Sequence, residues 1–267
     1  MNKINFLLIV FSIFSYGQNN YNTVNINYTE ITDFGILAET SSTLEVNNTK
    51  SVYTRKKINY KAIDNDITIK QYKDTIANKE EVLEAYYSNS FNNIIYLKDR
   101  NLSQKLIVKD SIIDINWDID ASVNDQLFLG YNCKKATGKF RGRNYTVWFT
   151  TEIPIRFGPW KLHGLPGLVL KVQDDLNQIL IQATEIIISK KTKIEFINLD
   201  DLEEISIKEH ILLTKEKDNE FLNEVMTRVQ STMPRGTIIK DFEKDNSKNN
   251  RFEIKYEWEE EEKKKED

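Results

Sequence analysis

The chain has 267 residues, with 37 lysines and arginines against 41 aspartates and glutamates, one cysteine and two histidines. A charged fraction of 29% beside 40% hydrophobic residues is typical of a globular protein and excludes a disordered one. The single cysteine excludes an intrachain disulfide framework and cysteine-based metal clusters, and His163 and His210 are too few for a histidine-rich metal site. We therefore expect no cofactor and no bound metal.

The first seventeen residues have the pattern of a secretory signal peptide. Lys3 precedes an apolar stretch over residues 4–14, about half of the ~20 residues that a membrane-spanning helix needs. Ser15 and Gly17 are the small residues that a signal peptidase requires before cleavage at Gln18. The pattern predicts an exported chain without a transmembrane segment after cleavage, and a short buried N-terminal element is the alternative. An acidic exported chain is a poor candidate for binding nucleic acid.

After this leader, residues 18–258 are expected to form a single β-rich domain, followed by a charged tail over residues 259–267. Apolar and polar residues alternate with period two in many segments, which is typical of strands with one wet face. The predicted strands are Thr23–Glu30, Ile67–Lys73, Asn93–Lys98, Lys105–Lys109, Ile113–Asp120, Asn144–Thr151, Leu168–Val172, Gln178–Thr184, Lys193–Ile197 and Phe252–Glu259.

Two helices are predicted. Ser206 and Glu209 have the spacing of a capping box, and apolar residues recur behind them at helical spacing as far as Val229. A second, shorter helix is expected over Asn78–Tyr87. The predicted fold class is mainly β (α+β), with a curved antiparallel sheet or open half-barrel packed on one or two helices. By analogy of strand order, this resembles the periplasmic lipoprotein carriers.

Glycine and proline gather between residues 130 and 167, which hold six of the nine glycines and three of the four prolines. Because glycine adopts backbone conformations that are closed to other residues and proline fixes φ, the region is expected to form a rigid corner. The same region carries seven lysines and arginines against Glu152 alone, in a chain that is acidic overall.

One part of this region is similar to a known family. Residues 164–169 read Gly-Leu-Pro-Gly-Leu-Val and resemble the motif that names the GLPGLI family of exported Gram-negative proteins. The resemblance covers residues 117–174, and Val169 departs from the isoleucine of the motif. It implies a protein of the periplasm or of the outer-membrane periphery and implies no activity. The residues that we assign to the motif and to the structure of its corner are Cys133, Gly158, Pro159, Gly164, Leu165, Pro166 and Gly167.

Cys133 and the two arginines each allow two interpretations. Cys133 is either a nucleophile activated by the neighbouring lysines or a small residue buried in a strand, and we favour the buried residue. Arg141 and Arg143 flank a glycine and would point the same way on an extended backbone. They either hold a ligand carboxylate or phosphate, or form internal salt bridges with acidic residues in the 114–120 stretch.

We select five residues as a candidate binding set: Arg141, Arg143, Trp148, Phe149 and Trp160. The tryptophans either line a pocket or belong to the core, and no catalytic residue is proposed. The favoured hypothesis is a non-enzymatic periplasmic carrier of an apolar or amphipathic ligand, a lipid or a peptide. The alternatives are an accessory protein that binds an outer-membrane protein partner, and a cysteine-dependent enzyme.

Overall fold

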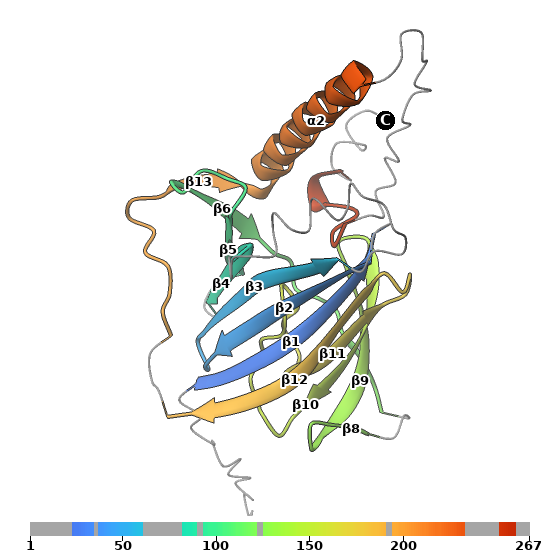
Figure 1. The fold of residues 1–267 in the computed structure, drawn as a ribbon. Coiled ribbons are helices and arrows are strands. Elements are labelled where there is room, and N and C mark those ends of the chain that lie inside the picture. The colour runs from blue at the N-terminus through green and yellow to red at the C-terminus, as the bar shows by residue number, and fades with distance from the viewer. Residues whose placement is uncertain are drawn as a thin grey trace, which may run out of the picture.

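The computed structural model describes residues 23–34, 37–60, 82–89, 93–121, 125–190, 194–232 and 251–259 (Figure 1). The predicted leader and the strand expected at Ile67–Lys73 lie outside these residues. The first strands are β1 (Thr23–Asp33), β2 (Leu37–Val46), β3 (Lys50–Tyr60), β4 (Glu84–Asn89), β5 (Ile94–Asp99) and β6 (Leu106–Ser111). The later ones are β7 (Asp118–Asp120), β8 (Gln126–Phe128), β9 (Tyr131–Phe140), β10 (Arg143–Thr150), β11 (Leu168–Asp174), β12 (Ile179–Ser189) and β13 (Glu203–Ser206), followed by helix α2 (Ile207–Thr232).

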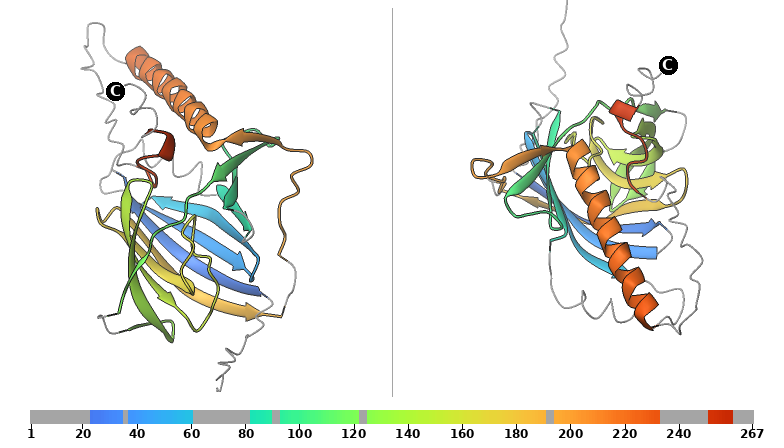
Figure 2. Two further views of the ribbon diagram at one scale, coloured as in Figure 1. Left: turned by 180° about the vertical axis from the view of Figure 1, so that it is seen from behind. Right: turned by 90° about the horizontal axis from the view of Figure 1, so that it is seen from above.

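The described strands form one open, curved sheet in the order β13-β6-β5-β4-β3-β2-β1-β12-β11-β10-β9-β7, with β8 paired to β9. Among these described strands, every pairing is antiparallel except that of β13 with β6. The predicted fold class, mainly β with a curved antiparallel sheet, is confirmed. Figures 1 and 2 show that the long central strands bend, so that one face of the sheet is concave.

Strand β1 shows why these residues form a sheet. Its burial alternates along the strand, and Val24, Ile26 and Tyr28 lie on the buried face. An alternation of this kind gives each strand one apolar face, and pairing β1 with β12 and β2 makes that face continuous. The Tyr28 hydroxyl donates a hydrogen bond to the Val169 carbonyl at 2.7 Å, so a buried polar tip is satisfied.

A loop, rather than a helix, covers the concave face. Residues 151–167 leave β10 and return to β11, which pairs directly with it. On the way the loop buries Ile153, Ile155, Trp160, Leu162 and Leu165. This is the glycine- and proline-rich corner, and it supplies the apolar residues that the sheet needs on that side.

Helix α2 has a different place from the expected one. It contacts β13 and β6, and it projects away from the curved sheet (Figure 1). The capping box is present, since the Ser206 amide donates to the Glu209 carboxylate at 2.7 Å and the Glu209 amide donates to the Ser206 hydroxyl. These hydrogen bonds hold the pKa of Glu209 below its ordinary value. None of the described helices is both long enough and apolar enough to cross a membrane.

Several local predictions are wrong. Glu84–Asn89 is a strand, so the described part of the helix expected at Asn78–Tyr87 is not helical. Of the strand expected at Ile113–Asp120, only Asp118–Asp120 pairs with a neighbour. Residues 194–197 are irregular, and residues 252–256 are irregular and lead into a helical turn over 257–259. Alternation alone does not make a strand where no neighbouring strand is free to pair with it.

Candidate functional site

A cavity of about 480 Å³ opens on the concave side of the sheet. Strands β1 to β5, the 151–167 loop, the first turns of α2 and the segment 251–256 all contribute to its walls. Its lining residues are Thr32, Phe34, Ala38, Thr40, Arg55, Glu84, Tyr86, Leu97, Trp160, Lys161, Ile207, His210, Ile211, Thr214, Arg251, Phe252, Glu253 and Tyr256. The cavity therefore combines aromatic faces with charged groups, as binding sites for polar organic molecules do.

The aromatic part of the cavity centres on Phe252. Its ring centroid lies 5.0 Å from that of Trp160 and 5.8 Å from that of Phe34, and the Arg55 guanidinium lies over it at 5.1 Å. Aromatic pairs in tilted and edge-on geometry stabilise one another. The rings thus form an apolar wall of the cavity.

Glu84 is the carboxylate of β4 at the cavity. It accepts a hydrogen bond from Arg55 Nη1 at 2.9 Å and another from the Tyr86 hydroxyl at 2.8 Å. Burial, together with the charge of Glu84, raises the pKa of Tyr86, so the phenol stays protonated and donates. A quarter of the Glu84 side chain is exposed, which leaves it able to accept hydrogen bonds from a ligand.

A buried layer fixes the position of Arg55. Its Nε donates to Glu30 at 2.9 Å, and Glu30 also accepts a hydrogen bond from Tyr53. The Tyr53 hydroxyl lies 2.8 Å from the Ser42 hydroxyl. Because Glu30 is buried, this layer holds one end of Arg55 while the other end holds Glu84.

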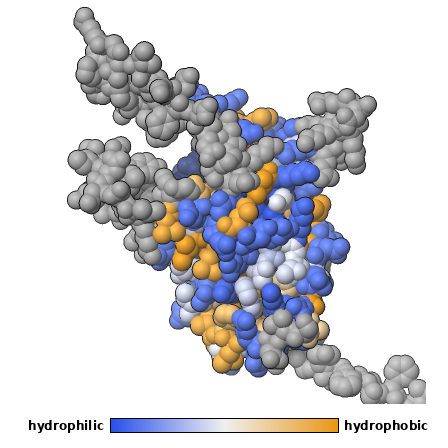
Figure 3. All heavy atoms as spheres, turned by 90° about the vertical axis from the view of Figure 1, so that its right-hand side faces the viewer, coloured by the Kyte–Doolittle hydropathy of each residue, from blue (hydrophilic) through white to orange (hydrophobic). Residues whose placement is uncertain are grey.

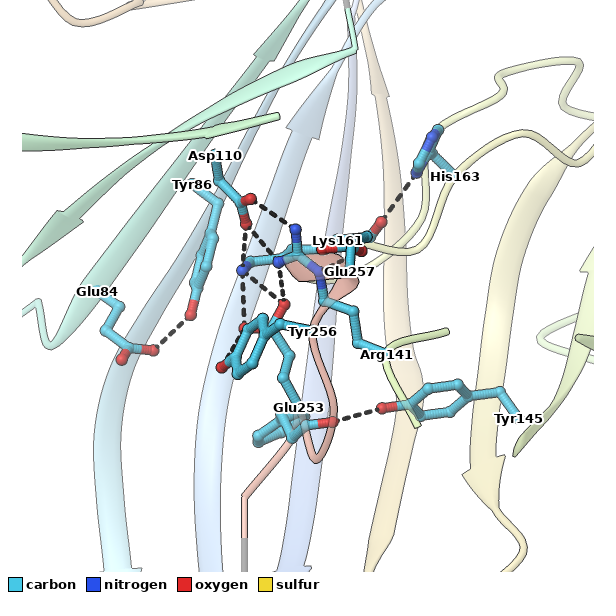
Figure 4. A network of polar contacts seen from close by, with 11 residues as sticks. Glu84, Tyr86, Asp110, Arg141, Tyr145, Lys161, His163, Glu253, Tyr256 and Glu257 are labelled. Carbon is cyan, nitrogen blue, oxygen red and sulfur yellow. Dashed lines mark hydrogen bonds and ion pairs between the residues drawn. The ribbon is translucent and has the colours of Figure 1, made fainter. Parts of the chain in front are cut away.

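A second polar network joins Asp110, Arg141, Lys161 and Glu253 (Figure 4). Arg141 binds the Asp110 carboxylate with two nitrogens, at 2.7 and 2.8 Å, and Lys161 donates to the same carboxylate at 2.6 Å. Glu253 accepts from Arg141 Nη1 at 2.6 Å and from Lys161 Nζ at 2.8 Å. Glu257 completes the set with Arg141 Nε at 3.0 Å.

The charges of this network fix its protonation. Burial alone would raise the pKa of Asp110, but Lys161 and Arg141 lower it to about 2. Burial alone would lower the pKa of Arg141, and its bonds with Asp110 and Glu253 raise it instead. Asp110 is therefore ionised at neutral pH and serves as a counterion rather than as a proton donor.

His210 lies where α2 meets the cavity. Its Nε2 lies 3.0 Å from the Asp99 carboxylate. Asp99 also accepts a hydrogen bond from the main-chain N–H of Asn101 at 2.8 Å. Asp99 thus joins β5 to the first turns of α2. In the described ranges, no three His, Cys, Asp or Glu side chains are grouped as metal ligands.

The predicted binding set does not come together in one place. Of its members, Trp160 lines the cavity and Phe149 is fully buried in the core. Trp148 faces the other side of β10, where it packs against Phe128 and Lys171.

On the described part of the face in Figure 3, hydrophilic residues dominate and apolar ones form separate patches.

Arg141 and Arg143 both form internal salt bridges. Their partners are Asp110 and Asp174, not the acidic residues of the 114–120 stretch. Arg141 has a φ of 41° and Gly142 one of 88°, so the two residues form the tight turn between β9 and β10 rather than extended backbone. An arginine in the left-handed region is strained, and its salt bridges hold it there.

Cys133 is buried on β9, and its thiol donates a weak hydrogen bond to the Tyr131 carbonyl at 3.6 Å. Burial, followed by the charge of Glu152, raises the pKa of the thiol to about 12. A protonated, buried thiol is not a nucleophile at neutral pH, so the structure favours the interpretation of Cys133 as a buried residue.

The motif residues shape the corner itself. Gly164 has a φ of 98°, and a Cβ on Gly167 would lie 2.0 Å from the Thr150 carbonyl oxygen. His163 Nδ1 lies 2.9 Å from the Lys161 carbonyl oxygen, and the Trp117 indole donates to the His163 carbonyl at 2.8 Å. The turn is therefore required by the backbone, whatever the protein does.

Sequence reasoning missed the main residues of the cavity and its polar network: Arg55, Glu84, Tyr86, Asp110, Lys161 and Glu253. A signal existed for one pair, because Glu84 and Tyr86 are two residues apart and share a face of a strand. Assigning their segment to a helix concealed it. The charge excess at residues 130–167 indicates acidic partners, but these come from distant strands and from segment 251–257.

The sequence of the chain matches one known protein family. The family model described as "N-glycanase peptide, N-terminal domain" matches residues 40–209. The chain belongs to this family. No curated protein matches the chain.

Three solved structures are similar to the chain. PNGF-II in a C2 crystal form is 21% identical, with a TM-score of 0.45 over 69% of this chain and 30% of that one. PNGF-II in a P21 form is 20% identical, with a TM-score of 0.45 over 70% of this chain and 32% of that one. An uncharacterized conserved protein from Thermus thermophilus is 6% identical, with a TM-score of 0.37 over 70% of this chain and 91% of that one. The chain thus spans about a third of the PNGF-II chains.

Family membership corrects three predictions. Assignment to the GLPGLI family is wrong, because the N-glycanase family model spans the whole motif region. A turn that the backbone requires is a weak marker of family. The non-enzymatic carrier and the absence of enzymatic function are also wrong, since the matching family is one of N-glycanases. The 151–167 loop occupies the concave face on which an apolar ligand was expected. The predicted export agrees with this family, and the compartment reached is a separate proposal.

Proposed function

We propose that this chain acts in the hydrolysis of N-linked glycans, and that its cavity contacts the saccharide of the glycoprotein substrate. The observation that carries the proposal is the match of the N-glycanase N-terminal domain to residues 40–209. That span contains most of β2, all of β3 to β5, the 151–167 loop and the start of α2, which together supply eight of the eighteen residues that line the cavity.

The chemistry of the cavity supports a saccharide ligand. A pyranose ring has apolar faces and a rim of hydroxyl groups, and it is bound by aromatic faces beside fixed hydrogen-bonding groups. Trp160 and Phe252 offer the aromatic wall. Glu84, Thr32 and Thr40 offer oxygen atoms for the hydroxyls. Because Arg55 and Tyr86 already hold Glu84, a ligand meets an acceptor of fixed orientation.

The same geometry indicates how the described residues share the work. The two glutamates that line the cavity form ion pairs with basic side chains. Glu84 pairs with Arg55, and Glu253 pairs with Arg141 and Lys161. Carboxylates paired in this way suit the orientation of substrate better than proton donation. We assign the cavity to substrate binding, in a larger hydrolytic system of which this chain supplies one domain.

A glycopeptide assay tests the proposal. The chain is incubated with a purified N-glycopeptide, and released glycan is measured by mass spectrometry while binding is measured by calorimetry. Saturable binding supports the proposed role of the cavity, and release of glycan places hydrolysis within this chain as well. If the glycopeptide is neither bound nor cleaved, and the same peptide without its glycan behaves identically, the proposal is wrong.

For the location, we propose the periplasm or the outer-membrane periphery, since the leader at residues 1–17 has the pattern of an export signal. Cell fractionation with a tagged full chain tests this. Recovery of the tag in the cytoplasmic fraction with the leader still attached would contradict it.

A further inference from the structure

Segment 251–257 lies against the turn between β9 and β10, held by bonds to its main chain. The Ile254 and Lys255 amides donate to the Arg141 carbonyl at 2.9 and 3.1 Å. Arg143 donates to the Arg251 carbonyl through Nε at 2.8 Å and through Nη2 at 2.6 Å. Because these bonds go to backbone groups, they are available to any peptide in this conformation.

Side chains add specificity to this backbone grip. Phe252 enters the space between Trp160 and Phe34, with ring centroids 5.0 and 5.8 Å away. The next residue, Glu253, receives Arg141 and Lys161 at 2.6 and 2.8 Å. The Tyr256 ring then lies 5.3 Å from the Arg141 guanidinium. The pattern recognised is an aromatic residue, a glutamate and a second aromatic residue three positions later.

The charges around Glu253 show that a carboxylate is required beside Arg141 and Lys161. The side chains of Arg141 and Lys161 are only 1% and 2% exposed, and Asp110 is their fully buried partner. Without Glu253 and Glu257, two buried cations would share one carboxylate. A buried uncompensated charge is strongly unfavourable, so removal of the segment leaves a site that favours an acidic replacement.

The residues that hold segment 251–257 lie within the range matched by the family model, and the segment itself lies outside that range. Arg141, Arg143, Trp160 and Lys161 lie within residues 40–209, which the family model matches, whereas residues 251–257 lie beyond it. The binding residues thus belong to the family domain, and the bound residues 251–257 are a separate segment of this chain.

We propose that Arg141, Arg143, Trp160 and Lys161 form a peptide-binding site for an extended aromatic–glutamate segment. Residues 251–257 occupy this site from within the chain, and an acidic aromatic peptide from another protein competes for it. The proposal does not rest on the N-glycan function, because it concerns a peptide held through its backbone, its carboxylate and its aromatic rings.

A competition experiment with the full chain tests the site. The probe is a fluorescein-labelled peptide of residues 251–258, Arg-Phe-Glu-Ile-Lys-Tyr-Glu-Trp. A full-chain Phe252→Ala/Glu253→Gln variant, which weakens the internal occupant, is expected to bind the probe at least tenfold more tightly than the wild type does. The probe carrying glutamine in place of its first glutamate is expected to bind at least tenfold more weakly. Glu204→Gln, which breaks an exposed ion pair with Lys109, is the matched control and should behave as the wild type.

Equal binding of the probe to the wild type and the double variant, or equal binding of the two probes, would overturn the proposal. A measurement on the wild type covers the case in which the double variant fails to fold. Excess unlabelled peptide should accelerate hydrogen exchange at the Ile254 and Lys255 amides at least threefold, because it displaces the segment. Unchanged exchange under saturating peptide would also overturn the proposal.

Discussion

Lys161 and Glu253 come from segments 92 residues apart, yet Lys161 Nζ lies 2.8 and 3.0 Å from the two carboxylate oxygens of Glu253. Lys161 belongs to the loop that covers the concave face, and Glu253 to the segment that lies against it. Both side chains also line the cavity. One ion pair therefore joins the loop, the segment and the proposed substrate site. A substitution in any one of these three parts is expected to alter the structure of the other two.

The first prediction concerns acid stability and Asp110. Its folded-state pKa is lowered from 3.8 to about 2, so its contribution is complete above about pH 4 and is lost as the pH falls through about 2. A depression of this size corresponds to roughly 2 kcal/mol. At neutral pH, Asp110→Asn should lower the free energy of unfolding by about 3 kcal/mol, because Arg141 and Lys161 lose a buried counterion.

Urea unfolding at several pH values checks this. The difference between the wild type and Asp110→Asn should shrink by roughly 2 kcal/mol between pH 4 and pH 2. Asp118→Asn is the control, since Asp118 is an exposed aspartate outside the network of Arg141 and Lys161. A difference that stays constant across the acid range would contradict the role given to Asp110.

The second prediction concerns the backbone of the corner. A Cβ on Gly167 would lie 2.0 Å from the Thr150 carbonyl oxygen, which is part of the strand that the corner leaves. Gly167→Ala must therefore move β10 or the loop, and should cost about 2–4 kcal/mol. Gly130→Ala is the control, because a Cβ on Gly130 would meet no neighbouring atom. Only its φ of 85° disfavours a side chain, at a cost of about 1 kcal/mol. Thermal unfolding of both variants distinguishes them, and equal shifts would show that the close contact is unimportant.

The fold could be predicted further than the site, for a physical reason. Strand pairing rests on alternation within one segment, and β1, β5, β6, β10, β11 and β12 lie close to where the pattern placed them. Alternation also identified residues 252–258, but whether such a segment becomes a strand depends on a free sheet edge, which the pattern does not contain. Segment 251–257 instead meets the β9–β10 turn through hydrogen bonds to individual carbonyls.

The site depends on pairs that no local pattern records. The charge excess near Arg141 implied acidic partners, yet Asp110 lies 31 residues away in sequence and Glu253 lies 112 residues away. The prediction of an extended backbone at Arg141 also failed, since a left-handed arginine in a two-residue turn departs from the usual asparagine or glycine. Strained positions of this kind are where local rules fail and where sites are found.

The third prediction concerns Cys133. With its pKa raised to about 12, the thiol has a thiolate fraction about a thousandfold below that of a free cysteine at pH 8. A maleimide or disulfide reagent should therefore label the folded chain at least a hundredfold more slowly than the urea-unfolded chain. Cys133→Ala should fold and lose about 1–2 kcal/mol of stability, as expected for a small buried side chain. Rapid labelling of the folded protein would show that the thiol is accessible.

The last prediction tests the cavity through Glu84. Glu84→Gln keeps the shape of the side chain but removes the charge that strengthens hydrogen bonds to a saccharide hydroxyl, so N-glycopeptide affinity should fall about tenfold. Stability should change by only about 1 kcal/mol, because Arg55 remains paired with Glu30. Tyr86→Phe removes one of the two groups that orient Glu84, and its effect on affinity should be smaller. Calorimetry against the same glycopeptide measures both variants, with Glu204→Gln as an ion-pair control outside the cavity lining. If Glu84→Gln binds as tightly as the wild type, the saccharide does not use this carboxylate, and the cavity has another role.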